Sequence, residues 1–312
     1  MKPISRPVRR GLILFFLTVA LASILHLALW AMQSYQSGKV QDGLEQLYHQ
    51  GGLTIGQSDP NQEVQEEAST EGAEDNAGGT STEDANAGTS FEPVMLPEYR
   101  KLYEINSDIV GWLNIGDGLL STPVMQRDNE YYLTHDFYGE EDKHGFLDKG
   151  NSPQLTDDNT ILYGHNITSD RSMFNILTRY KDTEFAAEHP VIQLNTLYNR
   201  YQYAVAAVYI VSTRPEHGEL FDYISYLKFS TRDAKQAYIA QIQKRSLIDT
   251  GVKMTADDRL LTLSTCTYEF ADARLVVVAR QLREGESAED FGKQVVKREN
   301  PVMPQIWNEL FG

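Results

Sequence analysis

An apolar run near the amino terminus constrains this chain more than any other feature. Residues 11–32 are almost wholly apolar, and about 20 such residues are enough for one helical crossing of a bilayer. A basic flank before a span keeps the amino end in the cytoplasm. That flank, residues 1–10, contains no acidic residue and carries Lys2, Arg6, Arg9 and Arg10. We therefore expect a single-pass anchor in the cell membrane, with residues 1–10 cytoplasmic and the rest of the chain outside.

A cleaved signal peptide is the alternative interpretation of this run. Its apolar core would be shorter, and a small-x-small cleavage site would follow it. Here the run ends in residues 29–33, whose sequence LWAMQ is a poor cleavage site. The sequence therefore favours an uncleaved anchor at residues 11–32.

A stalk and an acidic linker are expected at residues 33–95. The spacing of Val40, Leu44 and Leu47 predicts that a helix continues to about residue 50. Between Asp59 and Glu92 the chain has ten acidic residues and no Lys or Arg, so we expect this segment to be disordered. It accounts for most of the formal charge of −16 and says nothing about substrate. With no basic patch visible, nucleic acid is not an expected partner.

One mainly β domain is expected at residues 96–312. Short runs rich in β-branched and aromatic residues predict eight strands, which favours a barrel or a sandwich. The expected strands are 111–115, 122–126, 145–148, 160–165, 191–194, 201–211, 260–265 and 274–281. Helices are expected at 97–105, 171–177, 232–244 and 288–296, the third of them capped by Thr231 and lying in the long connection before the cysteine strand.

The only cysteine, Cys266, ends the strand-like run 261–266. In an exported chain it has no partner for an internal disulfide. Polar neighbours and the nearby cation Arg274 favour a nucleophilic thiolate. The alternative is a small buried hydrophobe in a sheet, and these residues alone leave both interpretations open.

A thiol nucleophile needs a proton-transfer partner and a donor for the oxyanion. Of the seven histidines, His165 stands out because it ends an apolar strand and is followed by a polar segment. Its alternative role is a surface loop histidine. Arg274 provides a permanent charge for an oxyanion, and its alternative role is an ion pair with Glu269 or Asp272.

Several motifs together resemble the class B sortases, membrane-anchored cysteine transpeptidases of Gram-positive bacteria. The sequence TLSTC at 262–266 looks like the family's TLxTC signature, and Arg274 falls where the family has its arginine. The resemblance covers about residues 96–282. The other matching segments are 108–113 (DIVGWL), 128–133 (DNEYYL), 162–166 (LYGHN) and 171–174 (RSMF).

The resemblance implies a sortase-type eight-stranded β-barrel with amino-terminal helices and a helix in the loop before the cysteine strand. It implies that Cys266 attacks a sorting motif of a secreted protein, that His165 acts as general acid and base, and that Arg274 holds the oxyanion. The acceptor would be an amine of a peptidoglycan precursor or cross-bridge. No cofactor and no metal are expected. The positions that look like substrate-groove residues are Asn129, Leu133, Tyr163, Ser264 and Thr265, for which core packing or a turn is the alternative.

Three other interpretations fit parts of the sequence. A papain-type peptidase places its cysteine before its histidine, whereas His165 precedes Cys266 here. A pilin-polymerising sortase would use a lysine acceptor and often carries a lid motif and a second span, which the sequence does not show. A non-catalytic surface binding module would require an inert Cys266.

Overall fold

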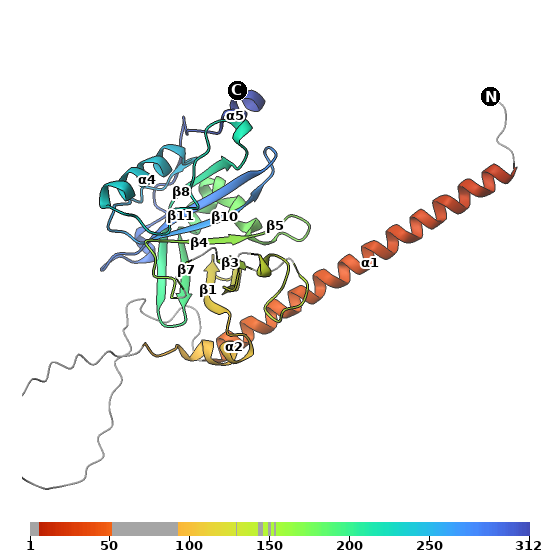
Figure 1. Ribbon diagram of the computed structural model, residues 1–312, viewed down its shortest axis with the longest axis horizontal. Coiled ribbons are helices and arrows are strands. Elements are labelled where there is room, and N and C mark those ends of the chain that lie inside the picture. The colour runs from red at the N-terminus through yellow and green to blue at the C-terminus, as the bar shows by residue number, and fades with distance from the viewer. Residues whose placement is uncertain (1–5, 52–92, 129, 143–145, 149–150, 153) are drawn as a thin grey trace, which may run out of the picture.

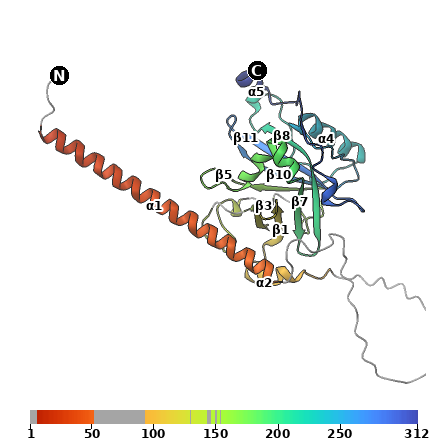
Figure 2. The ribbon, with the colours of Figure 1, turned by 180° about the vertical axis from the view of Figure 1, so that it is seen from behind.

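The computed structural model describes residues 6–51, 93–128, 130–142, 146–148, 151–152 and 154–312 (Figure 1). A long helix, α1 (Arg6–Gln50), projects away from a barrel of strands, and the view from behind shows the same arrangement (Figure 2). The acidic segment 59–92, for which we predict disorder, and the predicted groove residue Asn129 both lie outside the described residues.

In the described part of the chain, eight strands close into a barrel in the order β1-β2-β3-β4-β10-β11-β8-β7, with β7 pairing back onto β1. The pairs β2–β3 and β4–β10 are parallel, so the sheet is mixed. Each predicted strand has a counterpart, but α1 makes the whole chain mixed α/β. The strands are β1 (Ile109–Ile115), β2 (Leu120–Met125), β3 (Phe146–Asp148), β4 (Asn159–Gly164), β7 (Val191–Thr196), β8 (Arg200–Ser212), β10 (Leu260–Thr267) and β11 (Ala273–Gln281).

Two of the predicted helices are confirmed. The first begins as the 3₁₀-helix η1 (Pro97–Tyr99) and continues as α2 (Arg100–Ile105). The second is α4 (Arg232–Arg245), which lies in the connection between β8 and the cysteine strand. The predicted cap is also present, because the Thr231 hydroxyl accepts a hydrogen bond from the Ala234 amide at 3.1 Å. The short 3₁₀-helices η2 (Tyr131–Leu133) and η4 (Pro215–His217) were not predicted.

The helix predicted at 171–177 is wrong in its first part. The chain instead forms a hairpin, β5 (Asn166–Ile167) with β6 (Ser172–Met173), and only then the 3₁₀-helix η3 (Phe174–Lys181). Arg171 and Met173 have positive φ angles of 60° and 56°, which a right-handed helix excludes. A further helix, α3 (Thr183–Glu188), follows with Asp182 as its cap.

The helix predicted at 288–296 is also wrong. Only the 3₁₀-turn η5 (Ala288–Asp290) forms there, and Gly292 then takes a φ of +79°, where helical geometry ends. The chain next forms β12 (Val296–Lys297), which pairs with β9 (Ile248–Asp249). The last helix, α5 (Gln305–Phe311), was not predicted.

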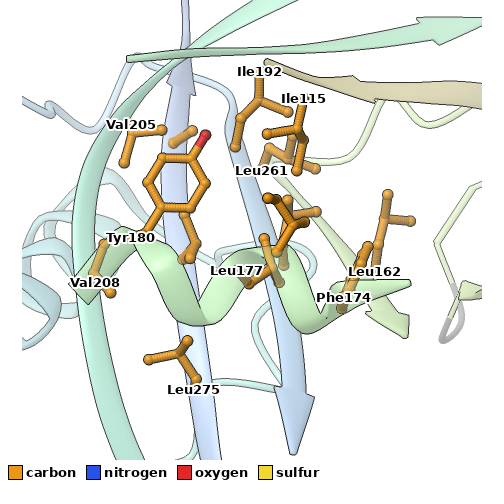
Figure 3. Close-up of a cluster of buried hydrophobic side chains, with 14 of the residues drawn as sticks. Ile115, Leu162, Phe174, Leu177, Tyr180, Ile192, Val205, Val208, Leu261 and Leu275 are labelled. Atoms are coloured by element: carbon orange, nitrogen blue, oxygen red, sulfur yellow. The ribbon is translucent and has the colours of Figure 1, made fainter. Parts of the chain in front are cut away.

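The largest hydrophobic core lies between η3 and the barrel strands (Figure 3). Phe174, Leu177 and Tyr180 of η3 pack there with strand residues such as Leu162 and Leu261. Because side chains alternate along a strand, the neighbours of these strand residues point to the opposite face. That opposite face of β8, β10 and β11 packs against α4 in a second core.

The second half of α1 belongs to the folded unit. Leu44 and Tyr48 are buried, and the Tyr48 ring stacks on Trp112 with ring centroids 4.3 Å apart. Leu96, the predicted first residue of the domain, is buried in the same cluster. A unit cut at residue 96 would therefore lose the end of a helix that shares its core. In contrast, the first half of α1 is apolar and exposed, and it is long enough to cross a bilayer.

Candidate active site

Cys266 and Arg274 are direct neighbours across two strands. The antiparallel register of β10 and β11 pairs Cys266 with Arg274. Paired residues point to the same face of a sheet, so the thiol and the guanidinium lie side by side. Both are partly exposed, whereas Ser264 and Thr265 before the cysteine are buried. The strand end thus presents a thiol and a fixed cation together.

His165 is brought to this strand end by the parallel pairing of β4 with β10. Tyr163 pairs with Ser264 at the end of this register, and β4 ends at Gly164, directly before His165. Two hydrogen bonds hold the segments together at this point. The Thr265 hydroxyl donates to the Gly164 carbonyl at 2.7 Å, and the Asn166 amide donates to the Cys266 carbonyl at 2.8 Å.

The orientation of the imidazole is set by a carbonyl group. The Nε2 atom of His165 lies 2.9 Å from the carbonyl oxygen of Leu133 in η2. A carbonyl oxygen only accepts, so Nε2 carries a proton and donates it. The other ring nitrogen, Nδ1, is the one left to exchange protons with a substrate.

Both carboxylates of the alternative ion pair with Arg274 have another cation as their salt-bridge partner, although Arg274 also helps to lower the pKa of Asp272. Asp272 pairs with Arg214, and the Arg214 guanidinium holds the pKa of that carboxyl below its ordinary value. Glu269 pairs with Lys181 at 2.5 Å. The hydrogen bond that the structure gives to the Arg274 side chain is from Nη1 to the neighbouring Ala273 carbonyl, at 3.0 Å.

The predicted groove residues divide into two groups. Leu133 and Tyr163 are partly buried in one hydrophobic cluster, and Leu133 also provides the carbonyl that orients His165. Ser264 and Thr265 are only 1% and 2% exposed, and their hydroxyls are engaged within the fold. Thr265 therefore acts here by tying the cysteine strand to the histidine segment. Its role in a substrate groove, like that of the other three, stays a prediction.

Tyr223 is a site residue that the sequence did not indicate. It lies in the connection after β8, and its hydroxyl is 2.7 Å from the Ser264 hydroxyl. The pKa of the Tyr223 phenol is raised above its ordinary value, chiefly by burial. Cys266 also raises this pKa, whereas the hydrogen bond with Ser264 and the charge of Arg274 lower it. The Tyr223 hydroxyl thus contacts the cysteine strand two residues before the thiol. No local pattern in this connection distinguishes Tyr223 from its neighbours Phe221 and Tyr226.

Asn166 and Tyr268 were missed as well. The sequence indicated Asn166 only as part of the LYGHN motif, yet its side chain donates to the Cys266 carbonyl and accepts from Asn175 at 2.7 Å. The Tyr268 hydroxyl donates to the Asn166 carbonyl at 3.1 Å. Together they connect the cysteine strand to β5.

Within the described residues, Cys266 belongs to no group of metal ligands and does not line the cavity between η3 and α3. Over the residues that the structure describes, no three His, Cys, Asp or Glu side chains gather as metal ligands. The cavity between η3 and α3 is lined by residues such as Arg179, Phe185 and Lys297, and by none of the predicted site residues.

Comparison with known proteins agrees with this geometry. The family model described as "Sortase domain" matches residues 113–282. The chain is similar to sortase B of Listeria monocytogenes, with 35% identity over 208 residues that cover 65% of this chain and 81% of the relative. It is also similar to sortase B of Staphylococcus aureus, with 34% identity over 194 residues that cover 60% and 75% of the two chains.

Solved structures give the same result. The chain is similar to a Bacillus anthracis protein described as similar to sortase B, with a TM-score of 0.59, 27% identity, and 80% and 96% of the two chains covered. It is similar to the Staphylococcus aureus sortase B–substrate complex, with a TM-score of 0.55, 32% identity, and 61% and 87% covered.

Proposed function

Since this chain belongs to the sortase B family of cysteine transpeptidases, we propose that it cleaves a sorting motif in secreted proteins and transfers the acyl group to a cell-wall amine. The observation that carries the proposal is the pairing of Cys266 with Arg274 beside the histidine segment. A relative has been solved as a substrate complex, and a sortase B that is 31% identical to this chain has been solved in complex with triglycine. A short peptide substrate and a glycine-type amine acceptor are therefore the first choices for this chain.

The first half-reaction forms a thioester. The Cys266 thiolate attacks the carbonyl carbon of the scissile peptide bond, and the electron pair moves to the oxygen. Arg274 donates hydrogen bonds to that oxyanion, and its charge beside the thiol also favours the thiolate. When the C–N bond breaks, the leaving amine takes a proton from Nδ1 of His165.

The second half-reaction resolves the thioester. An incoming primary amine attacks the same carbonyl, Nδ1 of His165 takes the proton that the amine loses, and the thiolate leaves. The bond from Nε2 to the Leu133 carbonyl engages that nitrogen, which leaves Nδ1 for the proton transfer in both steps. One histidine therefore acts first as acid and then as base.

The first half of α1 is proposed as a membrane anchor. It is exposed, apolar and continuous with the part of the helix that packs on the barrel. The basic residues before it favour a cytoplasmic amino terminus, which places the barrel outside the membrane. An anchored enzyme of this kind meets secreted proteins where they emerge.

The proposed function is tested with the full chain in detergent, a library of sorting-motif peptides, and three amines: triglycine, a peptidoglycan-stem amine and a pilin-type lysine peptide. We expect one motif to yield a Cys266 adduct that triglycine or the stem amine releases as a longer peptide. Release by the lysine peptide alone would favour pilin polymerisation. Absence of any adduct across the library, with Cys266 still alkylated readily by iodoacetamide, would contradict the function.

The roles of the two partners are separated by His165→Gln and Arg274→Lys. Lysine keeps the charge but loses the planar fork, so we expect Arg274→Lys to acylate roughly 10²–10³-fold more slowly. His165→Gln should slow both acylation and release by amine. A near wild-type acylation rate in Arg274→Lys would mean that Arg274 acts through its charge alone and not through hydrogen bonds to the oxyanion.

A further inference from the structure

Helix α1 contacts the barrel through polar side chains as soon as its apolar run ends at Met32. The Ser34 hydroxyl donates to Asp170 Oδ2 at 3.2 Å, and the Ser37 hydroxyl donates to Asp142. Further along, the Gln41 amide donates to the Ser121 carbonyl. The first two contacts are unusual because they reach loops rather than the barrel wall. One loop precedes β3, and the other joins β5 to β6.

The loop that Ser37 contacts leads to the ring of His165. The Asp142 amide donates to the Thr134 carbonyl at 2.8 Å. Thr134 directly follows Leu133, whose carbonyl accepts the proton of His165 Nε2 at 2.9 Å. A short series of contacts thus runs from α1 to the imidazole.

The loop that Ser34 contacts leads to the backbone of the same histidine. Asp170 Oδ1 accepts the Ser172 amide at 3.0 Å and the Ser172 hydroxyl at 2.5 Å. Ser172 pairs with Ile167 in the small hairpin, and the amide of Phe174 donates to the His165 carbonyl at 2.9 Å. A two-stranded hairpin of this size is marginal by itself, so it depends on contacts from outside.

We propose that Ser34 and Ser37 of α1 are positioning residues for His165. The Ser37 hydroxyl binds a carboxylate in the loop that orients the imidazole ring, and the Ser34 hydroxyl binds one in the loop that holds the histidine backbone. The proton-transfer group of the enzyme is thereby held by the segment that emerges from the apolar run. The proposal rests on the proposed function only in the role that it gives to His165.

The consequence is that the helix and the catalytic histidine share one rigid frame. Ser34 lies two residues after Met32, so at about 1.5 Å of rise per residue it is only about 3 Å beyond the apolar run. The contacts to α1 would therefore form next to the bilayer surface. Anything that tilts or releases α1 there would change the geometry of His165.

The test uses the full chain in detergent with the double variant Ser34→Ala, Ser37→Ala. The matched control is Ser23→Ala, because the Ser23 hydroxyl bonds only the Val19 carbonyl of its own helix, at 2.8 Å. Ser37→Thr in the Ser34 wild-type background is the conservative variant, since it keeps a hydroxyl. Two rates are measured across pH 5–9: alkylation of Cys266 by iodoacetamide, and acylation by the sorting peptide.

We expect the double variant to lose about threefold to tenfold in acylation rate and to shift the midpoint of its alkylation-versus-pH curve, with Ser23→Ala and Ser37→Thr like wild type. The pH curve separates positioning from stability, since a purely structural role would lower the melting temperature and leave the curve in place. Unchanged rates and an unchanged curve in the double variant would overturn the proposal. The alkylation measurement needs no sorting peptide. If the chain cleaves none of the peptides, the proposed function fails, but the alkylation curves still test whether Ser34 and Ser37 position His165.

Discussion

Substitution of Asn166 by alanine should uncouple the cysteine strand from the histidine segment. The Asn166 side chain is 8% exposed and makes two hydrogen bonds, to the Cys266 carbonyl at 2.8 Å and from Asn175 at 2.7 Å. Each buried hydrogen bond contributes roughly 0.5–1.5 kcal/mol, and an abandoned partner costs more, so we expect a loss of about 2–3 kcal/mol in the free energy of unfolding. For a domain of this size that lowers the melting temperature by roughly 4–10 °C.

The control for this prediction is Asn175→Ala. It removes the second of the two hydrogen bonds and leaves the bond to Cys266 intact. We expect it to cost about 1 kcal/mol. Comparison of the two variants therefore isolates the contact that joins the two catalytic segments.

The assay is single-turnover acylation at a temperature where both variants are folded. A displacement of about 1 Å between reacting groups can cost on the order of 10²-fold in rate, so Asn166→Ala should acylate about tenfold to a hundredfold more slowly than Asn175→Ala. Equal acylation rates in the two folded variants would refute the reasoning. The bond to Cys266 would then stabilise the fold without aligning the catalytic residues.

Two further predictions concern packing and pH. Leu44→Ala should lower the free energy of unfolding by about 2–5 kcal/mol because Leu44 is 1% exposed. Leu29→Ala, in the exposed half of α1, should leave the free energy of unfolding unchanged in detergent. Equal unfolding curves for the two variants would place α1 outside the folded unit. Burial raises the pKa of Glu269, but hydrogen bonds from Lys181 and Thr267 lower it below its ordinary value. A lowered carboxyl pKa stabilises the fold at pH values above the ordinary glutamate pKa near 4.3, and this stability is lost as the pH falls. Glu269→Gln should therefore lose less stability than wild type between pH 6 and pH 3, measured by chemical denaturation. Parallel losses in the two proteins would contradict the lowered pKa of Glu269.

The sequence predicted the strands well because each is a local pattern. The segments 260–265 and 274–281 are short, largely apolar runs without alternation, as expected of strands that are buried on both faces, so β10 and β11 could be recognised without knowing their partners. The signature residues and their order then led to Cys266, His165 and Arg274. The structure pairs Cys266 with Arg274 across β10 and β11, and a hydrogen bond from Asn166 joins the histidine segment to the Cys266 carbonyl.

The missed features depend on contacts between distant segments. The spacing of Val40, Leu44 and Leu47 predicted a helix, but Leu44 is buried in a cluster that includes Trp112, which is far away in sequence. The hairpin at 166–173 depends on positive φ angles at Arg171 and Met173, which these residue types do not indicate.

The partners of the hydroxyl groups near the thiol could not be predicted from the sequence either. The resemblance assigned Ser264 and Thr265 to a substrate groove, and in the fold their hydroxyls contact the Tyr223 hydroxyl and the Gly164 carbonyl. A side chain's polarity is visible in a sequence, but its hydrogen-bond partner is not. Tyr223 and Asn166 were missed for this reason, because their hydrogen-bond partners lie far away in sequence.

Intact-mass analysis of the full chain after a single turnover tests the central claim most directly. Mixed with its sorting peptide and no amine, the wild-type chain should gain the mass of the acyl fragment, and peptide mapping should place the adduct on Cys266. Cys266→Ala should stay folded, gain no mass and release no peptide. Cleavage of the peptide by folded Cys266→Ala at a rate near that of wild type would contradict the account.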